Sequence, residues 1–135
     1  AVATPVLVVV TLLVAGLGVL AVRRGVDRDA AGAWLATAMV TALIVTNPVG
    51  SPQFAIWLIA PALLLVAVRA WEGVAVIVVL CGLTQLCYPW LYGEVVGQEP
   101  IGVLVLTLRN AGYVVLLALA AWRLVRLPRT AEVGV

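Results

Sequence analysis

Residues 5–24 read PVLVVVTLLVAGLGVLAVRR, an uncharged apolar run that ends in two arginines. A helix that crosses a bilayer needs about 20 consecutive, mostly apolar residues. Four further apolar runs of similar length follow, separated by short stretches that contain charged residues, Pro or Gly. The sequence therefore predicts an all-α fold, a polytopic transmembrane helical bundle. Its five expected helices cover residues 5–22, 30–46, 52–70, 73–92 and 101–122.

The overall composition favours the same class of protein. Hydrophobic residues make up 65% of the 135 residues, and charged residues only 10%. A soluble domain is about half apolar and about a quarter charged, so its surface needs more polar groups than this chain offers. No soluble domain or internal repeat is visible. We expect residues 1–135 to form a single transmembrane domain.

Arginine placement predicts how the helices are oriented. The chain has no Lys, and seven arginines fall in alternate connections or after the last helix. They are Arg23, Arg24, Arg28, Arg69, Arg123, Arg126 and Arg129. Positively charged loops stay in the cytoplasm, so the C-terminus is expected there and the N-terminus outside. Because the chain starts outside and without Met, we expect the C-terminal portion of a longer protein, or else a trimmed N-terminus.

The connection TNPVGSPQ, residues 46–53, is the first polar site expected on the external side. Ser51 is predicted to cap the helix 52–70, with Pro52 as its first residue. A helix N-terminus attracts anions such as phosphate, and Gln53 stands in its first turn. The competing interpretation is a tight turn between two helices with no ligand.

Arg109 is the one arginine expected well inside a span. An ionisable residue there costs about 2.5–3.5 kcal/mol on insertion scales, so it normally faces the protein interior, a cavity or a partner charge. Helical spacing places four residues on the same face: Gly102, Val105, Gly112 and Tyr113. One interpretation is that Arg109 contacts an anionic group such as phosphate. The other is that it snorkels outward or pairs with Glu94 or Glu99.

Reactive groups are otherwise scarce. Glu94 and Glu99 are the external carboxylates; they are expected to keep their loop solvated, and the alternative roles are a base or a metal ligand. The chain has no His and a single Ser, and its two Cys residues cannot build the usual four-ligand zinc site without His. We therefore expect no metal and no cofactor. The arginines are spread along the chain, which argues against a nucleic acid partner.

Two residues inside the spans are expected to have structural roles. Pro61 lacks the backbone N–H of a helical residue and should kink the helix 52–70. Gln85 should hydrogen-bond a neighbouring helix, as polar side chains in membrane spans commonly do.

The stretch VGSPQFAIW, residues 49–57, with Pro61 after it, resembles a known family. It is similar to the C-terminal half of the actinobacterial polyprenyl-phosphate-mannose-dependent mannosyltransferases, which have the C-type glycosyltransferase (GT-C) fold. In that family a Ser-Pro-Gln-aromatic-x-x-Trp stretch opens a late helix at the external face. An Arg-Asn pair in a later helix is matched here by Arg109-Asn110. The resemblance covers roughly residues 40–125.

The resemblance implies that a sugar, mannose in that family, moves from a polyprenyl-phosphate donor to a lipid or glycan acceptor. The reaction would take place on the outer side of a bacterial inner membrane. The resemblance assigns donor-phosphate binding to Ser51, Gln53 and Arg109, and it makes membrane lipid and the family's N-terminal helices the partners. The family's catalytic Asp lies in the first external loop, whereas Asp27 and Asp29 here fall in a cytoplasmic loop. This stretch is therefore expected to lack the catalytic residue.

Two other functions stay open at this stage. A non-enzymatic polytopic membrane protein, such as an assembly subunit or scaffold, fits the scarcity of reactive groups. A small transporter has less support, because transporters place several ionisable or unwound elements near the midplane. Here only Pro61, Thr84 and Gln85 lie there.

Overall fold

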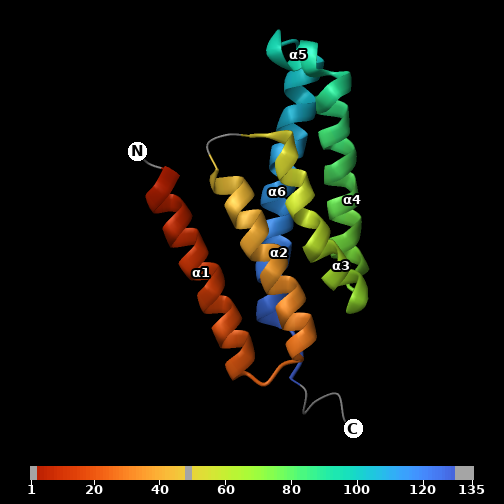
Figure 1. Ribbon diagram of the computed structural model, residues 1–135. Helices are drawn as coiled ribbons and strands as arrows, with labels where there is room; N and C mark the ends of the chain where they lie inside the picture. The colour runs from red at the N-terminus through yellow and green to blue at the C-terminus, as the bar shows by residue number, and fades with distance from the viewer. Residues whose placement is uncertain (1–2, 48–49, 130–135) are drawn as a thin grey trace.

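The computed structural model describes residues 3–47 and 50–129. Helices run up and down beside one another (Figure 1), so the predicted all-α bundle is confirmed. Within these ranges the only strand-type pairing is one isolated β-bridge. In chain order the elements are α1 (Ala3–Arg23), α2 (Arg28–Thr46), η1 (Pro52–Leu58), α3 (Ile59–Ala67), α4 (Trp71–Gln85), η2 (Leu86–Trp90), α5 (Tyr92–Val96) and α6 (Pro100–Arg126).

Most of these helices can cross a membrane. Four are long and apolar enough: Pro5–Arg23, Arg28–Thr46, Trp71–Trp90 and Pro100–Arg126. The chain is therefore a membrane protein, and about five spans agrees with one more apolar helix, the shorter Pro52–Ala67. That helix joins the 3₁₀ element η1 to α3. Because a 3₁₀ helix rises about 2.0 Å per residue and an α-helix about 1.5 Å, the pair reaches about 27 Å, close to the hydrocarbon thickness of about 30 Å.

The kink predicted at Pro61 stays a prediction, but a change of helix type, from 3₁₀ to α, lies beside this residue. Pro61 is buried and is the third residue of α3, just after the 3₁₀ segment ends at Leu58. Pro has no backbone N–H, so it cannot donate the α-helical hydrogen bond to the carbonyl of Trp57. The tighter 3₁₀ winding lies on the N-terminal side of that missing bond.

Helix α3 ends at Ala67 rather than at residue 70, because a C-terminal cap closes it. Arg69 has a φ of 57°, in the left-handed region. Its N–H donates to the carbonyl of Val66 at 3.0 Å, and the N–H of Ala70 donates to the carbonyl of Leu65 at 2.8 Å. These two bonds form a Schellman motif, in which the left-handed residue is most often Gly.

Replacing Arg69 by Gly is expected to stabilise the protein by about 1 kcal/mol relative to Arg69→Ala. A left-handed conformation costs a residue with a Cβ roughly 1–2 kcal/mol, and Gly adopts it freely. Both variants lose the charge, so their difference reports the backbone alone. Thermal unfolding in detergent measures it, and equal stabilities would contradict the cap.

Helix α4 is shorter than the predicted helix 73–92. It begins at Trp71 and ends at Gln85, and a π-type turn, η2, continues it. Tyr88 has extended backbone angles, with φ −150° and ψ 119°, and the Tyr88–Pro89 peptide bond is cis. A residue before Pro is pushed out of the helical region, which explains the break. The short helix α5 (Tyr92–Val96) occupies the first part of the connection between the predicted helices 73–92 and 101–122.

Helix α6 is the centre of the bundle. It packs against α2, α4, α5 and α1, and Figure 1 shows it behind and between the other helices. Its buried residues are Gly102, Val105, Arg109, Tyr113, Leu116, Ala120 and Leu124. The face predicted from helical spacing is thus buried, apart from Gly112, which is half-buried beneath Leu80.

The seven arginines of the connections and tail lie at one end, called here the Arg-rich end (Figure 1). Arg24 Nη1 donates to the carbonyl of Val125 at 2.6 Å. An antiparallel bridge joins Val26 to Arg129, so the α1–α2 turn is tied to the end of α6. Arg123 Nη2 forms an ion pair with Glu72 Oε1 at 2.8 Å across α6 and α4.

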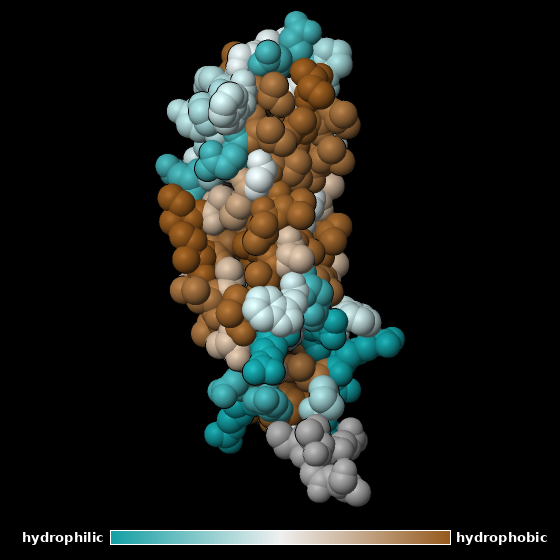
Figure 2. Space-filling model, turned by 90° about the vertical axis from the view of Figure 1, so that its right-hand side faces the viewer, coloured by the Kyte–Doolittle hydropathy of each residue, from teal (hydrophilic) through white to brown (hydrophobic). Residues whose placement is uncertain are grey.

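The outer surface between the two ends is apolar. Figure 2 shows hydrophobic residues over most of one face and hydrophilic residues gathered at the ends. On α1 alone, Val8, Val9, Leu12 and Leu13 are all half or more exposed. Water would penalise such a surface, whereas lipid would not, which is the distribution expected of a bundle embedded in a bilayer.

Candidate functional site

Arg109 is buried in the bundle, with 3% of its surface exposed. It lies on α6 opposite the start of η1. Its Nη1 and Nη2 donate to the carbonyl of Gly50 at 3.3 and 3.4 Å, and Nη2 also donates to the carbonyl of Ser51 at 3.4 Å. Its Cζ lies 5.5 Å from the centre of the Tyr113 ring. The side chain is thus held inside the protein and does not snorkel.

These contacts leave much of the guanidinium charge uncompensated. Charge-assisted hydrogen bonds are usually about 2.7–2.9 Å long, so bonds of 3.3–3.4 Å are weak. The Nε of Arg109 and the hydroxyl of Tyr113 are buried without a hydrogen-bond partner in the described parts of the chain. A cavity of about 280 Å³ adjoins them, lined by Asn47, Gly50 and Phe54 among others. A cavity lined by a buried cation is suited to binding an anion.

Glu94 and Glu99 lie nearer than Arg109 to the end of the bundle opposite the Arg-rich end. Glu94 is on α5, and Glu99 is the N-cap residue of α6. The N–H of Glu99 donates to the carbonyl of Glu94 at 2.8 Å, which closes α5. Ten residues of α6 separate Glu99 from Arg109, about 15 Å along the axis. Arg109 forms no ion pair with either carboxylate, so that interpretation of the buried charge is wrong.

Ser51 and Gln53 lie on different sides of the first turn of η1. Ser51 occupies the predicted N-cap position and Pro52 the first turn, but the Ser51 side chain makes no capping hydrogen bond. Its carbonyl accepts from Arg109 instead. Gln53 is exposed and lines a second, larger cavity. The structure therefore brings Ser51 to Arg109 and leaves Gln53 on the neighbouring groove.

This groove runs between η1 with the start of α3 and α4 with η2. Its volume is about 730 Å³. The residues that line it are Pro52, Gln53, Ala55, Ile56, Ile59, Cys81, Thr84, Gln85, Tyr88, Pro89 and Tyr92. Ile56, Tyr88 and Tyr92 are each half or more exposed, so the groove opens on the lipid-facing surface.

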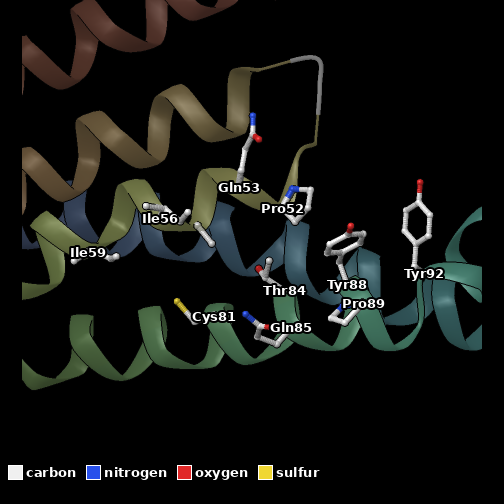
Figure 3. A pocket seen from close by; sticks show the side chains of 11 residues that line it. Pro52, Gln53, Ile56, Ile59, Cys81, Thr84, Gln85, Tyr88, Pro89 and Tyr92 are labelled. Atoms are coloured by element: carbon white, nitrogen blue, oxygen red, sulfur yellow. The ribbon is translucent and has the colours of Figure 1, made fainter.

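A few polar groups interrupt the apolar wall. Figure 3 shows Cys81, Thr84 and Gln85 extending from α4 toward η1, while Gln53 points away from them. The Thr84 hydroxyl donates to the carbonyl of Leu80 at 2.8 Å. Gln85 is exposed in the groove, and no hydrogen bond to a neighbouring helix is seen for it, contrary to expectation. Its amide is available to a ligand.

Two aromatic residues stand at the end of the groove farther from the Arg-rich end. Tyr88 and Tyr92 meet edge to face, with ring centres 5.3 Å apart. The break at Pro89 turns the chain so that both rings border the groove (Figure 3). Sequence reasoning identified neither tyrosine as a site residue. A Pro near the end of an apolar helix was the signal that could have pointed to them.

The arrangement is suited to an amphiphile. The first turn of η1 separates an apolar groove, which suits a hydrocarbon chain, from a buried cation, which suits an anionic group. Among the described residues, no group of three or more His, Cys, Asp or Glu side chains could hold a metal ion. The aspartates Asp27 and Asp29 lie at the opposite, Arg-rich end, where Asp27 caps α2. No family model, curated protein or solved structure matches the chain.

Proposed function

We propose that this chain forms the donor-binding part of a membrane glycosyltransferase. The donor would be a polyprenyl-phosphate sugar, with mannose as the sugar, and the acceptor a lipid or glycan on the extracytoplasmic side. One observation carries the proposal: the apolar groove and the buried Arg109 lie on the two sides of the same turn, at Pro52 and Gln53.

The groove suits the prenyl chain. Burying apolar area stabilises a bound chain by about 25 cal/mol per Å², and the groove walls are mostly Ile, Pro, Ala and aromatic residues. Binding sites for small molecules commonly have about 300–1,000 Å³ and a few polar groups that fix orientation. Gln85, whose side chain extends into the groove, would supply such a group here.

Arg109 suits the phosphate. A guanidinium binds phosphate oxygens with two parallel N–H groups, and the Nε of Arg109 has no partner within the described part of the protein. In the transfer step the acceptor hydroxyl oxygen bonds to the anomeric carbon, and the bond from that carbon to the phosphate oxygen breaks. Polyprenyl phosphate leaves with the electron pair, and a general base takes the hydroxyl proton. Arg109 would stabilise the charge that gathers on the leaving phosphate.

The base would come from elsewhere. The carboxylates described on the groove side, Glu94 and Glu99, belong to α5 and the start of α6, and the proposal assigns the base to an Asp on helices outside this sequence. In the same proposal the Arg-rich end lies in the cytoplasm of a bacterial inner membrane. The groove then opens to the outer leaflet, where the donor is used.

Filling the groove tests the proposal. Ile56→Trp should raise the KM for polyprenyl-phosphate mannose at least about tenfold with little change in kcat, because it removes binding shared by ground and transition states. Initial rates in membranes from cells that make the full-length protein measure this. Val78→Trp is the matched control, since Val78 is exposed on α4 away from the groove. Equal KM values for the two variants would refute donor binding in the groove.

A non-enzymatic role as an assembly subunit or scaffold is the second candidate. One observation favours it: Arg109 donates hydrogen bonds to the carbonyls of Gly50 and Ser51, just before η1. These bonds link α6 to the residues that precede η1. In that case Arg109 contributes to folding alone. Substitutions at Arg109 distinguish the two candidate functions, because only the donor-binding function requires a cation at this position.

A further inference from the structure

Three arginines surround a separate cavity at the Arg-rich end. Arg24, Arg126 and Arg129 line it together with Val125, Leu127 and Pro128, and its volume is about 310 Å³. That volume is at the lower end of the range for ligand pockets, roughly 300–1,000 Å³. Arg24 comes from the α1–α2 turn, Arg126 from the last turn of α6 and Arg129 from the residues just after it. The group is therefore brought together by the fold and not by the local sequence alone.

Contacts hold the side chains of Arg24 and Arg126 and the backbone of Arg129 in place. Arg24 Nη1 donates to the carbonyl of Val125 at 2.6 Å. The bridge between Val26 and Arg129 fixes the backbone of Arg129 beside the same turn. The Cζ of Arg126 lies 5.2 Å from the centre of the Trp122 ring. Positioned side chains lose less conformational entropy when a ligand binds.

Among the described residues, no negative side chain balances the positive charge of this cavity. No carboxylate lines it among the residues described. Asp27 accepts from the backbone N–H groups of Asp29 and Ala30, and Glu72 is paired with Arg123. The carbonyl end of α6 supplies only about half a negative charge. Within the described part of the chain, the negative charge near the cavity is therefore much smaller than the positive charge of its three guanidinium groups.

The cavity also lies where the exposed apolar surface of α6 meets the Arg-rich end. Val125 lines it and is 47% exposed, and Trp122, one turn earlier on α6, is 46% exposed. Tryptophan collects at the membrane–water interface, so the apolar surface ends here and the polar end begins. A ligand at this position has its headgroup among the arginines and its chains along the apolar surface of α6.

We propose that Arg24, Arg126 and Arg129 bind the phosphate-bearing headgroup of an anionic phospholipid. Guanidinium groups match phosphate oxygens in geometry and charge. A phospholipid, unlike free phosphate, also covers the exposed apolar residues beside the cavity. The site lies at the opposite end from the groove and is independent of the transfer reaction.

Native mass spectrometry with added phosphatidylglycerol tests the site. The purified protein in detergent should bind phosphatidylglycerol, and Arg126→Gln/Arg129→Gln should weaken that binding about a hundredfold, since each charge-assisted contact is worth at least about tenfold. The control Arg28→Gln/Arg69→Gln removes the same charge from the same end but away from the cavity, and it should change binding less than about threefold. Thermal unfolding checks that both variants are folded.

Two results would overturn the proposal. Equal weakening in both double variants would mean diffuse attraction to charge rather than a site. Displacement of phosphatidylglycerol by millimolar inorganic phosphate would mean that the cavity takes free phosphate rather than a lipid. If the Gln variant does not fold, Arg126→Lys/Arg129→Lys keeps the charge without the paired geometry, and unchanged binding in that variant would contradict the site.

Discussion

Under the proposed function, replacing Arg109 by Met is expected to lower sugar transfer about 100- to 1,000-fold while the bundle stays folded. Loss of one charged donor at a developing negative charge commonly costs this much in kcat. Met keeps the apolar stem of the side chain. A cation inside a span costs about 2.5–3.5 kcal/mol on insertion scales, and three bonds of 3.3–3.4 Å return little of it. The Met variant should therefore unfold at the same temperature or a higher one.

Initial rates with labelled donor and thermal unfolding in detergent measure the two effects separately. Leu108→Met, on the exposed side of the same helix, should leave both unchanged. Arg109→Lys keeps the charge but not the paired N–H groups, and it should transfer at an intermediate rate. Wild-type rates in Arg109→Met would refute the proposed phosphate contact. Unfolding of both the Met and Lys variants would instead favour the scaffold, in which Arg109 only fastens the α2–η1 connection.

Replacing Gly102 by Val is expected to destabilise the protein by about 3 kcal/mol and to disturb the groove. A Cβ at Gly102 would lie 2.5 Å from the backbone carbon of Glu94 and the backbone nitrogen of Val95. A side chain can relieve such a contact by changing its rotamer, but backbone atoms cannot. Helix α5 must therefore move, and overpacking of this kind costs about 1–3 kcal/mol or more. Tyr92 is the first residue of α5 and lines the groove. Its displacement should raise the KM for the donor.

Gly82→Val provides the matched control. Gly82 lies on the exposed side of α4, and no atom lies within 4 Å of a Cβ built there. The same substitution should change stability by no more than about 0.5 kcal/mol. Thermal unfolding of the two variants measures the difference. If Gly102→Val and Gly82→Val unfold at the same temperature, α5 does not pack on α6 as described.

The number and order of the helices could be predicted from the sequence because the thickness of lipid fixes the length of an apolar run. Their ends could be predicted less well. Helix α2 begins at Arg28 rather than residue 30, since Asp27 caps it by accepting from two N–H groups. Helix α4 ends early because Pro89 forces Tyr88 out of the helical region. Such ends depend on single hydrogen bonds and backbone angles, which apolar composition does not report.

The packing faces could not be predicted from hydrophobic periodicity. In a soluble protein apolar residues mark the buried face, whereas in a membrane both the lipid-facing and the buried residues are apolar. Leu12 and Leu13 are about two-thirds exposed, and Leu65 and Leu116 are fully buried, yet all four are Leu within apolar runs. Only the face of α6 was predictable, since a charged residue must turn away from lipid.

For the same reason the candidate site was predicted only in part. The burial of Arg109 follows from the cost of a charge in lipid. Its hydrogen-bond acceptor, the carbonyl of Gly50, is 59 residues away in the sequence. Because every residue has a backbone carbonyl, the amino-acid type at position 50 does not indicate this contact. The groove was missed because Ile56 and Ile59 look like ordinary span residues. Its existence depends on how η1 and α4 diverge, and this is a property of the fold.

The central position of α6 has a consequence for how the protein is made. Of the helices described, α6 leaves the ribosome last, yet α2 and α4 pack against it. The α1–α2 pair can associate as soon as it is inserted. Helix α4, in contrast, stays exposed to lipid on the face that packs against α6 until α6 is inserted. Arg24 and Val26 likewise have no contact with Val125 and Arg129 until the chain beyond α6 is complete. A premature stop before α6 would therefore leave α1, α2 and α4 inserted but without the contacts that each makes with α6.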